Sequence, residues 1–161
     1  MTPPEPGPAT GADGRSAADP HHRALEALYA AAPVNALFPS TLSVTAPGAA
    51  QIAFTVDPRL FHAGGAAHGT TYFKMLDDAA FYAANSLVTD VFLLTTQFNL
   101  LLTRPLAAGP ARVEGRVVSA GRRMFVAEAR LLDGAGAEAA RGTGTFMRSR
   151  IALSGLPGYR R

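Results

Sequence analysis

The stretch GTTYFKMLDDAAFYAANSL, residues 69–87, decides the fold of this chain. It contains no proline, and its only glycine is its first residue. Placed on a helix of about 3.6 residues per turn, it is apolar on nearly every side. A helix that is apolar all round lies inside a protein, where other elements cover it. We therefore predict a buried helix over these residues.

The segments around this helix are typical of strands in an antiparallel sheet. Small or apolar residues alternate with charged residues along these segments, as Val113, Gly115 and Val117 do with Glu114 and Arg116. Glycine, proline or an Asp-Gly pair separates one segment from the next. The expected strands span 41–46, 50–56, 92–103, 111–120, 124–132 and 138–148. They predict an α+β fold in which a curved antiparallel sheet wraps around one long central helix. A short N-terminal helix is expected over 21–32.

Length and composition fit one folded domain. The chain has 161 residues, of which 48% are hydrophobic and 17% charged, so global disorder is excluded. We expect the domain over 21–155, a disordered tail over 1–20 and a C-terminal tail over 156–161. The absence of cysteine excludes disulfides and thiol chemistry. Residues 1–20 do not have the basic start and apolar stretch of a secretory signal, so we expect a cytoplasmic location.

The charged residues indicate a small anionic ligand and no nucleic acid. The net charge is +3, and the 14 arginines are scattered along the chain. Nucleic-acid binders normally gather such charge on one helix or face. Scattered guanidinium groups suit a few phosphates of a small molecule. No apolar run reaches about 18 residues, so we expect no membrane span.

Asp77 and Asp78 are the main candidates for acid–base chemistry, because they lie on the buried helix. Lys74 precedes Asp78 by four residues, a spacing that pairs the two side chains, and we interpret this pair as a solvated helix edge. Asp77 shares its face with Phe73 and Phe81. An apolar setting raises the pKa of a carboxyl group and leaves it available as a base. Alternatively, Asp77 caps a neighbouring loop or pairs with a distant arginine.

The loop that leads into the helix supplies hydrogen-bond donors. Backbone N–H groups at a helix start lack intrahelical partners and carry the positive end of the dipole, so they can stabilise an oxyanion. Gly69 lets a substrate carbonyl approach closely because it has no Cβ. His62 and His68 either donate beside it or serve as ordinary capping or core residues. Together with Asp77 they do not have the spacing of a metal site, so we expect no metal.

These residues resemble the hotdog-fold acyl-CoA thioesterases of the PaaI-like (phenylacetyl-CoA thioesterase-like) group. The matching motifs occur in order as HGT at 68–70, the acid at 77, ANS at 84–86, TTQFNLLLTRP at 95–105, GRR at 121–123 and the last strand at 142–146. The resemblance covers roughly residues 35–150.

The resemblance implies hydrolysis of an acyl-CoA thioester to a free acid and CoA. The protein would be a homodimer or a dimer of dimers, with the site between subunits. Asp77 would act on water as a general base, or would itself be the nucleophile, and the Gly69 N–H of the opposing chain would polarise the carbonyl. His68 would support the loop and the thioester, and Thr95 would orient water.

The resemblance also implies the substrate contacts. Thr70, Phe73 and Phe81 would contact the substrate, and Arg122 and Arg123 would meet the CoA phosphates. No cofactor is implied, since coenzyme A belongs to the substrate. The expected partners are therefore the acyl-CoA and a second copy of the chain.

The chain departs from the family pattern at two positions. Thr70 replaces the second glycine of the His-Gly-Gly motif, and His62 replaces the usual Asn or Gln. Two other functions stay open. One is a hydratase or dehydratase acting on acyl thioesters, which needs His62 or His68 to pair with Asp77. The other is a non-catalytic acyl-CoA binding protein. The sequence does not specify the acyl group.

Overall fold

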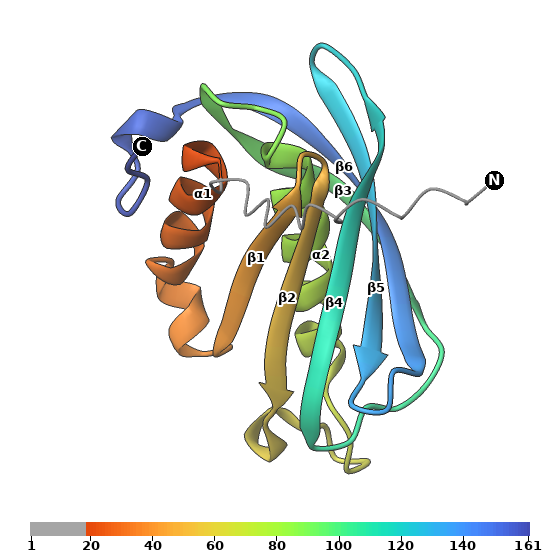
Figure 1. Cartoon of the computed structure of the whole chain (residues 1–161). Helices are drawn as coiled ribbons and strands as arrows, with labels where there is room; N and C mark the ends of the chain where they lie inside the picture. The colour runs from red at the N-terminus through yellow and green to blue at the C-terminus, as the bar shows by residue number, and fades with distance from the viewer. Residues whose placement is uncertain (1–18) are drawn as a thin grey trace, which may run out of the picture.

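One antiparallel sheet in the strand order β1-β2-β4-β5-β6-β3 forms the body of the computed structural model, which describes residues 19–161. Its strands are β1 (Ser40–Ala46), β2 (Ala49–Val56), β3 (Val91–Leu102), β4 (Gly109–Ala120), β5 (Met124–Asp133) and β6 (Glu138–Ala152). The helices are α1 (Pro20–Ala30), α2 (Gly69–Asn85) and the short 3-10 helices η1 (Pro33–Ala36), η2 (Pro58–Leu60) and η3 (Leu153–Gly155). The sheet curves around α2, and α1 lies beside β1 (Figure 1). The predicted α+β fold is confirmed.

The helix α2 is buried along most of its length, as its sequence predicts. Met75, Leu76 and Ala79 are at most 1% exposed, so they form the centre of the core. The helix approaches β4 closely at Gly115, where an added Cβ would collide with the carbonyl oxygen of Ala79. Glycine at this position therefore lets the helix and the sheet pack in direct contact.

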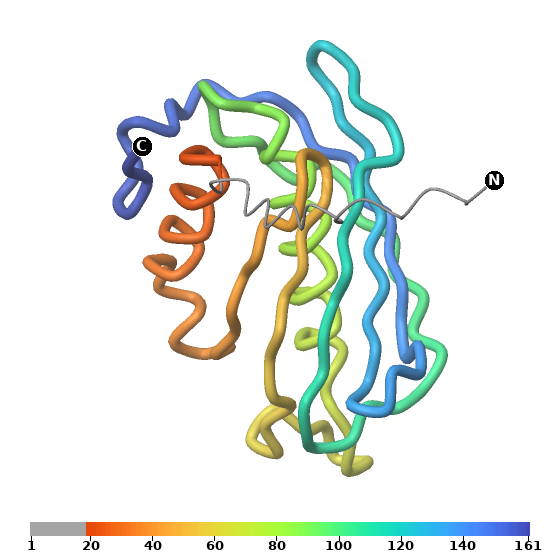
Figure 2. The backbone as a smooth tube through the Cα atoms, in the orientation of Figure 1, coloured from red at the N-terminus to blue at the C-terminus, as the bar shows by residue number. Residues whose placement is uncertain are grey.

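The ends of several elements differ from the prediction. The strand β6 continues to Ala152, four residues beyond the predicted end at 148, because it keeps pairing with the start of β3 after a bulge. The last residues then turn back to the start of α1 (Figure 2). There the Tyr159 hydroxyl lies 2.7 Å from Nδ1 of His21, and both side chains are buried.

Residues 1–18 of the expected N-terminal tail lie outside the described residues. Within residues 19–161, no helix is both long enough and apolar enough to cross a membrane.

Candidate active site

Asp77 lies on α2 and points toward β3, where it contacts Thr95. The Thr95 hydroxyl donates a hydrogen bond of 3.0 Å to Oδ1 of Asp77. Both side chains are partly buried. Asp77 and Thr95, which the sequence named as separate site residues, are therefore brought together within one chain.

A buried asparagine at the end of α2 sets this geometry. The side-chain oxygen of Asn85 accepts the backbone N–H of Leu93 at 2.9 Å. Its side-chain nitrogen donates to the carbonyl oxygens of Val88 and Val91. Because Asn85 is fully buried, these bonds fix the turn after α2 and start β3 alongside the helix. Thr95 follows two residues after Leu93, at a bulge where the strand shifts register.

The environment of Asp77 favours a proton acceptor near neutral pH. Burial raises the pKa of Asp77 to about 6, and the hydrogen bond from Thr95 opposes this rise by stabilising the charged form. The neighbouring charge of Asp78 raises the pKa further, while Lys74 lowers it. A carboxyl group that titrates near the working pH can both take and return a proton.

The second carboxylate, Asp78, is held in a buried network. Lys74 donates to Asp78 and to the side-chain oxygen of Asn35 at 2.6 Å, and its ammonium lies 4.9 Å from the ring centre of Tyr29. The Lys74 and Asp78 side chains are only 10% and 21% exposed, so the expected solvated helix edge is wrong, although the pairing itself is present. Burial raises the pKa of Asp78, against the opposing effect of Lys74.

Asp77 opens into a mostly apolar cavity of about 230 Å³, which we call the carboxylate cavity. Its walls come from α1, η1, α2 and β3, with the residues Tyr29, Ala32, Val34, Asn35, Asp77, Asp78, Phe81, Tyr82, Phe92, Leu93, Leu94 and Thr95. The only ionisable carboxyl groups on these walls are Asp77 and Asp78. Since Lys74 engages Asp78, Asp77 is the carboxylate that is open to a bound molecule.

The start of α2 forms a separate donor site. Nδ1 of His68 accepts the backbone N–H of Thr70 at 3.2 Å, whereas the Gly69 N–H has no partner among the described residues. Nδ1 of His62 accepts the N–H of Gly64 at 2.9 Å. Because Nδ1 is an acceptor in both rings, each neutral imidazole carries its hydrogen on Nε2 and can donate it. Gly69 and His62 line a cavity of about 280 Å³.

Asp77 and Gly69 do not meet within one chain. Gly69 begins α2, and Asp77 lies eight residues later, which corresponds to about 12 Å along the helix axis. The two residues line different cavities. His62 lies on the Gly69 side, so one chain does not bring it to Asp77 either.

The predicted substrate contacts are spread over the molecule. Phe81 is buried and lines the carboxylate cavity, but Phe73 is 43% exposed and stacks edge-on against Phe98. Thr70 lies exposed on the first turn of α2. Arg122 and Arg123 are exposed in the turn between β4 and β5.

Several cavity residues were missed by sequence reasoning. Tyr29 and Asn35 come from segments far from α2 in the chain, and Phe92 reads as an ordinary strand residue. Asn35 belongs to the four-residue helix η1, which is too short to show a hydrophobic pattern that would indicate a role for this residue. The proline at the start of η1 indicates a turn, but nothing in the sequence places that turn over Asp77.

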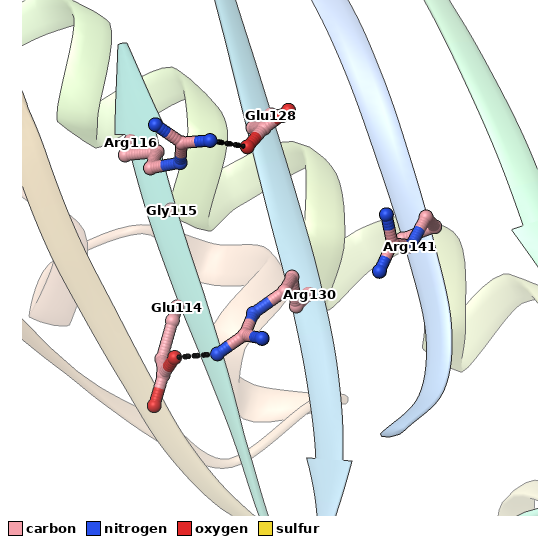
Figure 3. Close-up of a pocket in the computed structure, with 6 residues that line it drawn as sticks. All are labelled: Glu114, Gly115, Arg116, Glu128, Arg130 and Arg141. Carbon is pink, nitrogen blue, oxygen red and sulfur yellow. Dashed lines mark hydrogen bonds and ion pairs between the residues drawn. The ribbon is translucent and has the colours of Figure 1, made fainter. Parts of the chain in front are cut away.

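The outer face of the sheet has a further hollow, which carries paired charges (Figure 3). Glu114 pairs with Arg130 at 2.8 Å, and Arg116 pairs with Glu128. Since Gly115 faces α2, its neighbours along β4 face the opposite side of the sheet. The glutamates here are neutralised by arginine, so this hollow does not offer a free base.

Comparison with known proteins identifies the family. A model of the thioesterase superfamily matches residues 64–140, which include α2, β3, β4 and β5. A curated relative, named “Putative esterase SSO1253”, from Saccharolobus solfataricus, is 30% identical over 100 residues, which is 62% of this chain and 67% of the relative. The chain belongs to the thioesterase superfamily. This membership supports a hydrolase that acts on thioesters.

Solved structures share the fold. The PaaI protein of E. coli, from the phenylacetic acid degradation operon, matches with a TM-score of 0.74 and 19% identity, covering 83% of this chain and 99% of that one. A thioesterase family protein from Silicibacter pomeroyi matches with a TM-score of 0.70 and 27% identity, covering 77% and 96%. The fold is therefore the hotdog fold that the sequence motifs indicated.

Proposed function

We propose that this protein hydrolyses acyl-CoA thioesters to a free acid and CoA, with Asp77 as the general base. The observation that carries the proposal is the Asp77 carboxylate itself. It is partly buried, its pKa is raised to about 6 by burial, Thr95 holds it, and it opens into an apolar cavity. Water beside this carboxylate would lie next to the reacting end of an acyl group in the cavity.

In the proposed reaction, Asp77 accepts a proton from water while the water oxygen bonds to the thioester carbon. The tetrahedral intermediate then collapses and the carbon–sulfur bond breaks. The CoA sulfur takes the proton back from Asp77 and leaves as a thiol. Thr95 keeps Asp77 ionised and oriented for the first step. Direct attack by the carboxylate, through an anhydride, is the second route that the same geometry allows.

A second copy of the chain would complete the site. The strand β3 is at the edge of the sheet, and it exposes apolar side chains, with Leu94, Leu101 and Leu102 all at least 46% exposed. An open apolar edge strand favours pairing with another strand. A partner across this edge would bring its Gly69 N–H to the Asp77 cavity, which one chain does not do. We therefore propose a homodimer with shared sites.

The proposed ligand contacts follow from the same arrangement. Arg122 and Arg123 are exposed and have no ion-pair partner among the described residues, so they are free to bind the CoA phosphates. Coenzyme A enters as part of the substrate, and the proposal requires no other cofactor. A cytoplasmic location stays a prediction.

Product analysis tests the proposal against its alternatives. The purified protein is incubated with acyl-CoAs and enoyl-CoAs of several lengths, and the products are identified by mass spectrometry. Free acid with CoA thiol is expected. Hydroxyacyl-CoA from enoyl-CoA would instead establish a hydratase. Binding of acyl-CoA without any product would establish a binding protein.

A further inference from the structure

A second cavity lies next to the carboxylate cavity. It has a volume of about 250 Å³ and is lined by Leu28, Ala31, Ala32, Pro33, Tyr82, Phe92, Ile151, Leu156 and Pro157. We call it the tail chamber. Its walls come from the end of α1, the start of η1, the end of β6 and the segment after η3. None of its lining residues carries a charge at neutral pH, so it suits hydrocarbon and not a polar group.

The two cavities share a wall. Ala32, Tyr82 and Phe92 line both of them. Tyr82 is 5% exposed and is fixed edge-on against the rings of Tyr29 and Phe81, with centroid distances of 5.3 and 5.1 Å. Phe92 is only partly buried, and its closest ring contact is Phe81 at 4.7 Å. Phe92 is therefore the side chain of this wall that has room to turn aside.

We propose that the tail chamber holds the distal end of the acyl group, and that the preferred substrates are unbranched medium-chain acyl-CoAs. This inference rests on the proposed function, because it takes Asp77 as the place where the thioester reacts. The thioester lies at Asp77, the first methylenes fill the carboxylate cavity, and the chain continues past Phe92. Phe92 and Ile151 are then residues that determine specificity.

Cavity size supports this substrate class. Sites for small organic ligands usually measure about 300–1,000 Å³. The carboxylate cavity, at about 230 Å³, and the tail chamber, at about 250 Å³, each fall short of this range, but both joined fall within it. A short acyl group uses the first cavity alone. A medium-length chain fills both and buries more apolar surface.

The expected selectivity follows from methylene burial. Each buried methylene favours binding by about fourfold, so the four further methylenes of octanoyl-CoA favour it over butyryl-CoA by well over tenfold. The effect is expressed in kcat/KM, since the chain is buried both before and during the reaction.

The test compares octanoyl-CoA with butyryl-CoA on the full chain and two variants. Ile151→Trp fills the tail chamber and is expected to lower the octanoyl-to-butyryl ratio of kcat/KM by about tenfold or more. Val118→Trp introduces the same side chain at an exposed position that lines neither cavity, and it is expected to keep the wild-type ratio. Phe92→Ala removes the partition and is expected to raise turnover of dodecanoyl-CoA relative to butyryl-CoA by about tenfold.

The outcomes separate this inference from the proposed function. The role of the tail chamber is overturned if both substrates are hydrolysed, Ile151→Trp keeps the wild-type ratio and Phe92→Ala keeps the wild-type preference for chain length. The proposed hydrolysis of acyl-CoA would still hold in that case. If wild type shows no turnover, calorimetry of octanoyl-CoA and butyryl-CoA binding decides the matter. Tighter octanoyl-CoA binding that Ile151→Trp abolishes supports the chamber in a binding protein, and equal affinities overturn it.

Discussion

Removal of the hydroxyl that holds Asp77 is expected to shift the pH dependence of the reaction. Thr95→Val keeps the shape of the side chain but removes the 3.0 Å hydrogen bond to Oδ1 of Asp77. A hydrogen bond to a charged group contributes about 1.5–3 kcal/mol. One pKa unit corresponds to about 1.36 kcal/mol, so the pKa of Asp77 is expected to rise by about 1–2 units.

The sign follows from the role of Asp77 as a base. The ionised carboxylate is the active form, so activity rises with pH through the pKa of Asp77, which is about 6 in the native protein. A higher pKa of Asp77 moves this rising part of the pH profile to higher pH. At a pH equal to the native pKa, the variant is expected to be about 5- to 50-fold less active, and the two profiles converge about two units above the new pKa.

The assay is the pH profile of kcat/KM for hydrolysis of one acyl-CoA, followed by release of free CoA. Thr95→Ser keeps a hydroxyl, so its activity is expected to rise with pH over the same range as that of wild type. Thr96→Val is the matched control, because the Thr96 hydroxyl is exposed and bonds to the carbonyl oxygen of Thr145 on β6. A Thr95→Val profile that overlies the wild-type profile would refute the reasoning.

Two further substitutions test the packing that supports the site. Lys74→Met leaves Asp78 as a buried charge without its partner, so urea unfolding is expected to show a free energy of unfolding lower by about 3–5 kcal/mol. The double variant with Asp78→Asn should recover part of this loss. A Lys74→Met protein as stable as wild type would contradict the network. Gly115→Ala forces a methyl group against the backbone of α2 at Ala79. The free energy of unfolding is therefore expected to fall by about 1–3 kcal/mol, with a lower melting temperature. An unchanged melting temperature would show that the helix and the sheet are not in direct contact.

The fold was predictable from the sequence because its signals are local. The apolar stretch from residue 69 and the alternating strands after it each carry their own period, and the structure has these elements within a few residues of the expected ends. The end of β6 was misplaced because Arg148 and Arg150 break the apolar alternation. The strand continues there because its backbone still pairs with β3, and this pairing depends on a distant segment.

The candidate site was predictable only in part. The apolar neighbours of Asp77 on its own helix indicated a raised pKa, and the family resemblance marked Thr95 as a hydroxyl that orients water. Burial of the Lys74–Asp78 pair was not predictable, because Asn35 and Tyr29 cover it from segments that are distant in sequence. The cavities depend on the same long-range packing of α1, η1 and the C-terminal segment.

The most direct test of the central claim compares two carboxylates by turnover of octanoyl-CoA. Asp77→Asn keeps the size of the side chain and removes the base, so kcat is expected to fall by about 10²–10⁴ with the fold intact by circular dichroism. Asp57→Asn changes a carboxylate that is 28% exposed and pairs with Arg59 outside the site, and it is expected to keep wild-type turnover. An Asp77→Asn protein with kcat within about threefold of wild type would contradict the account.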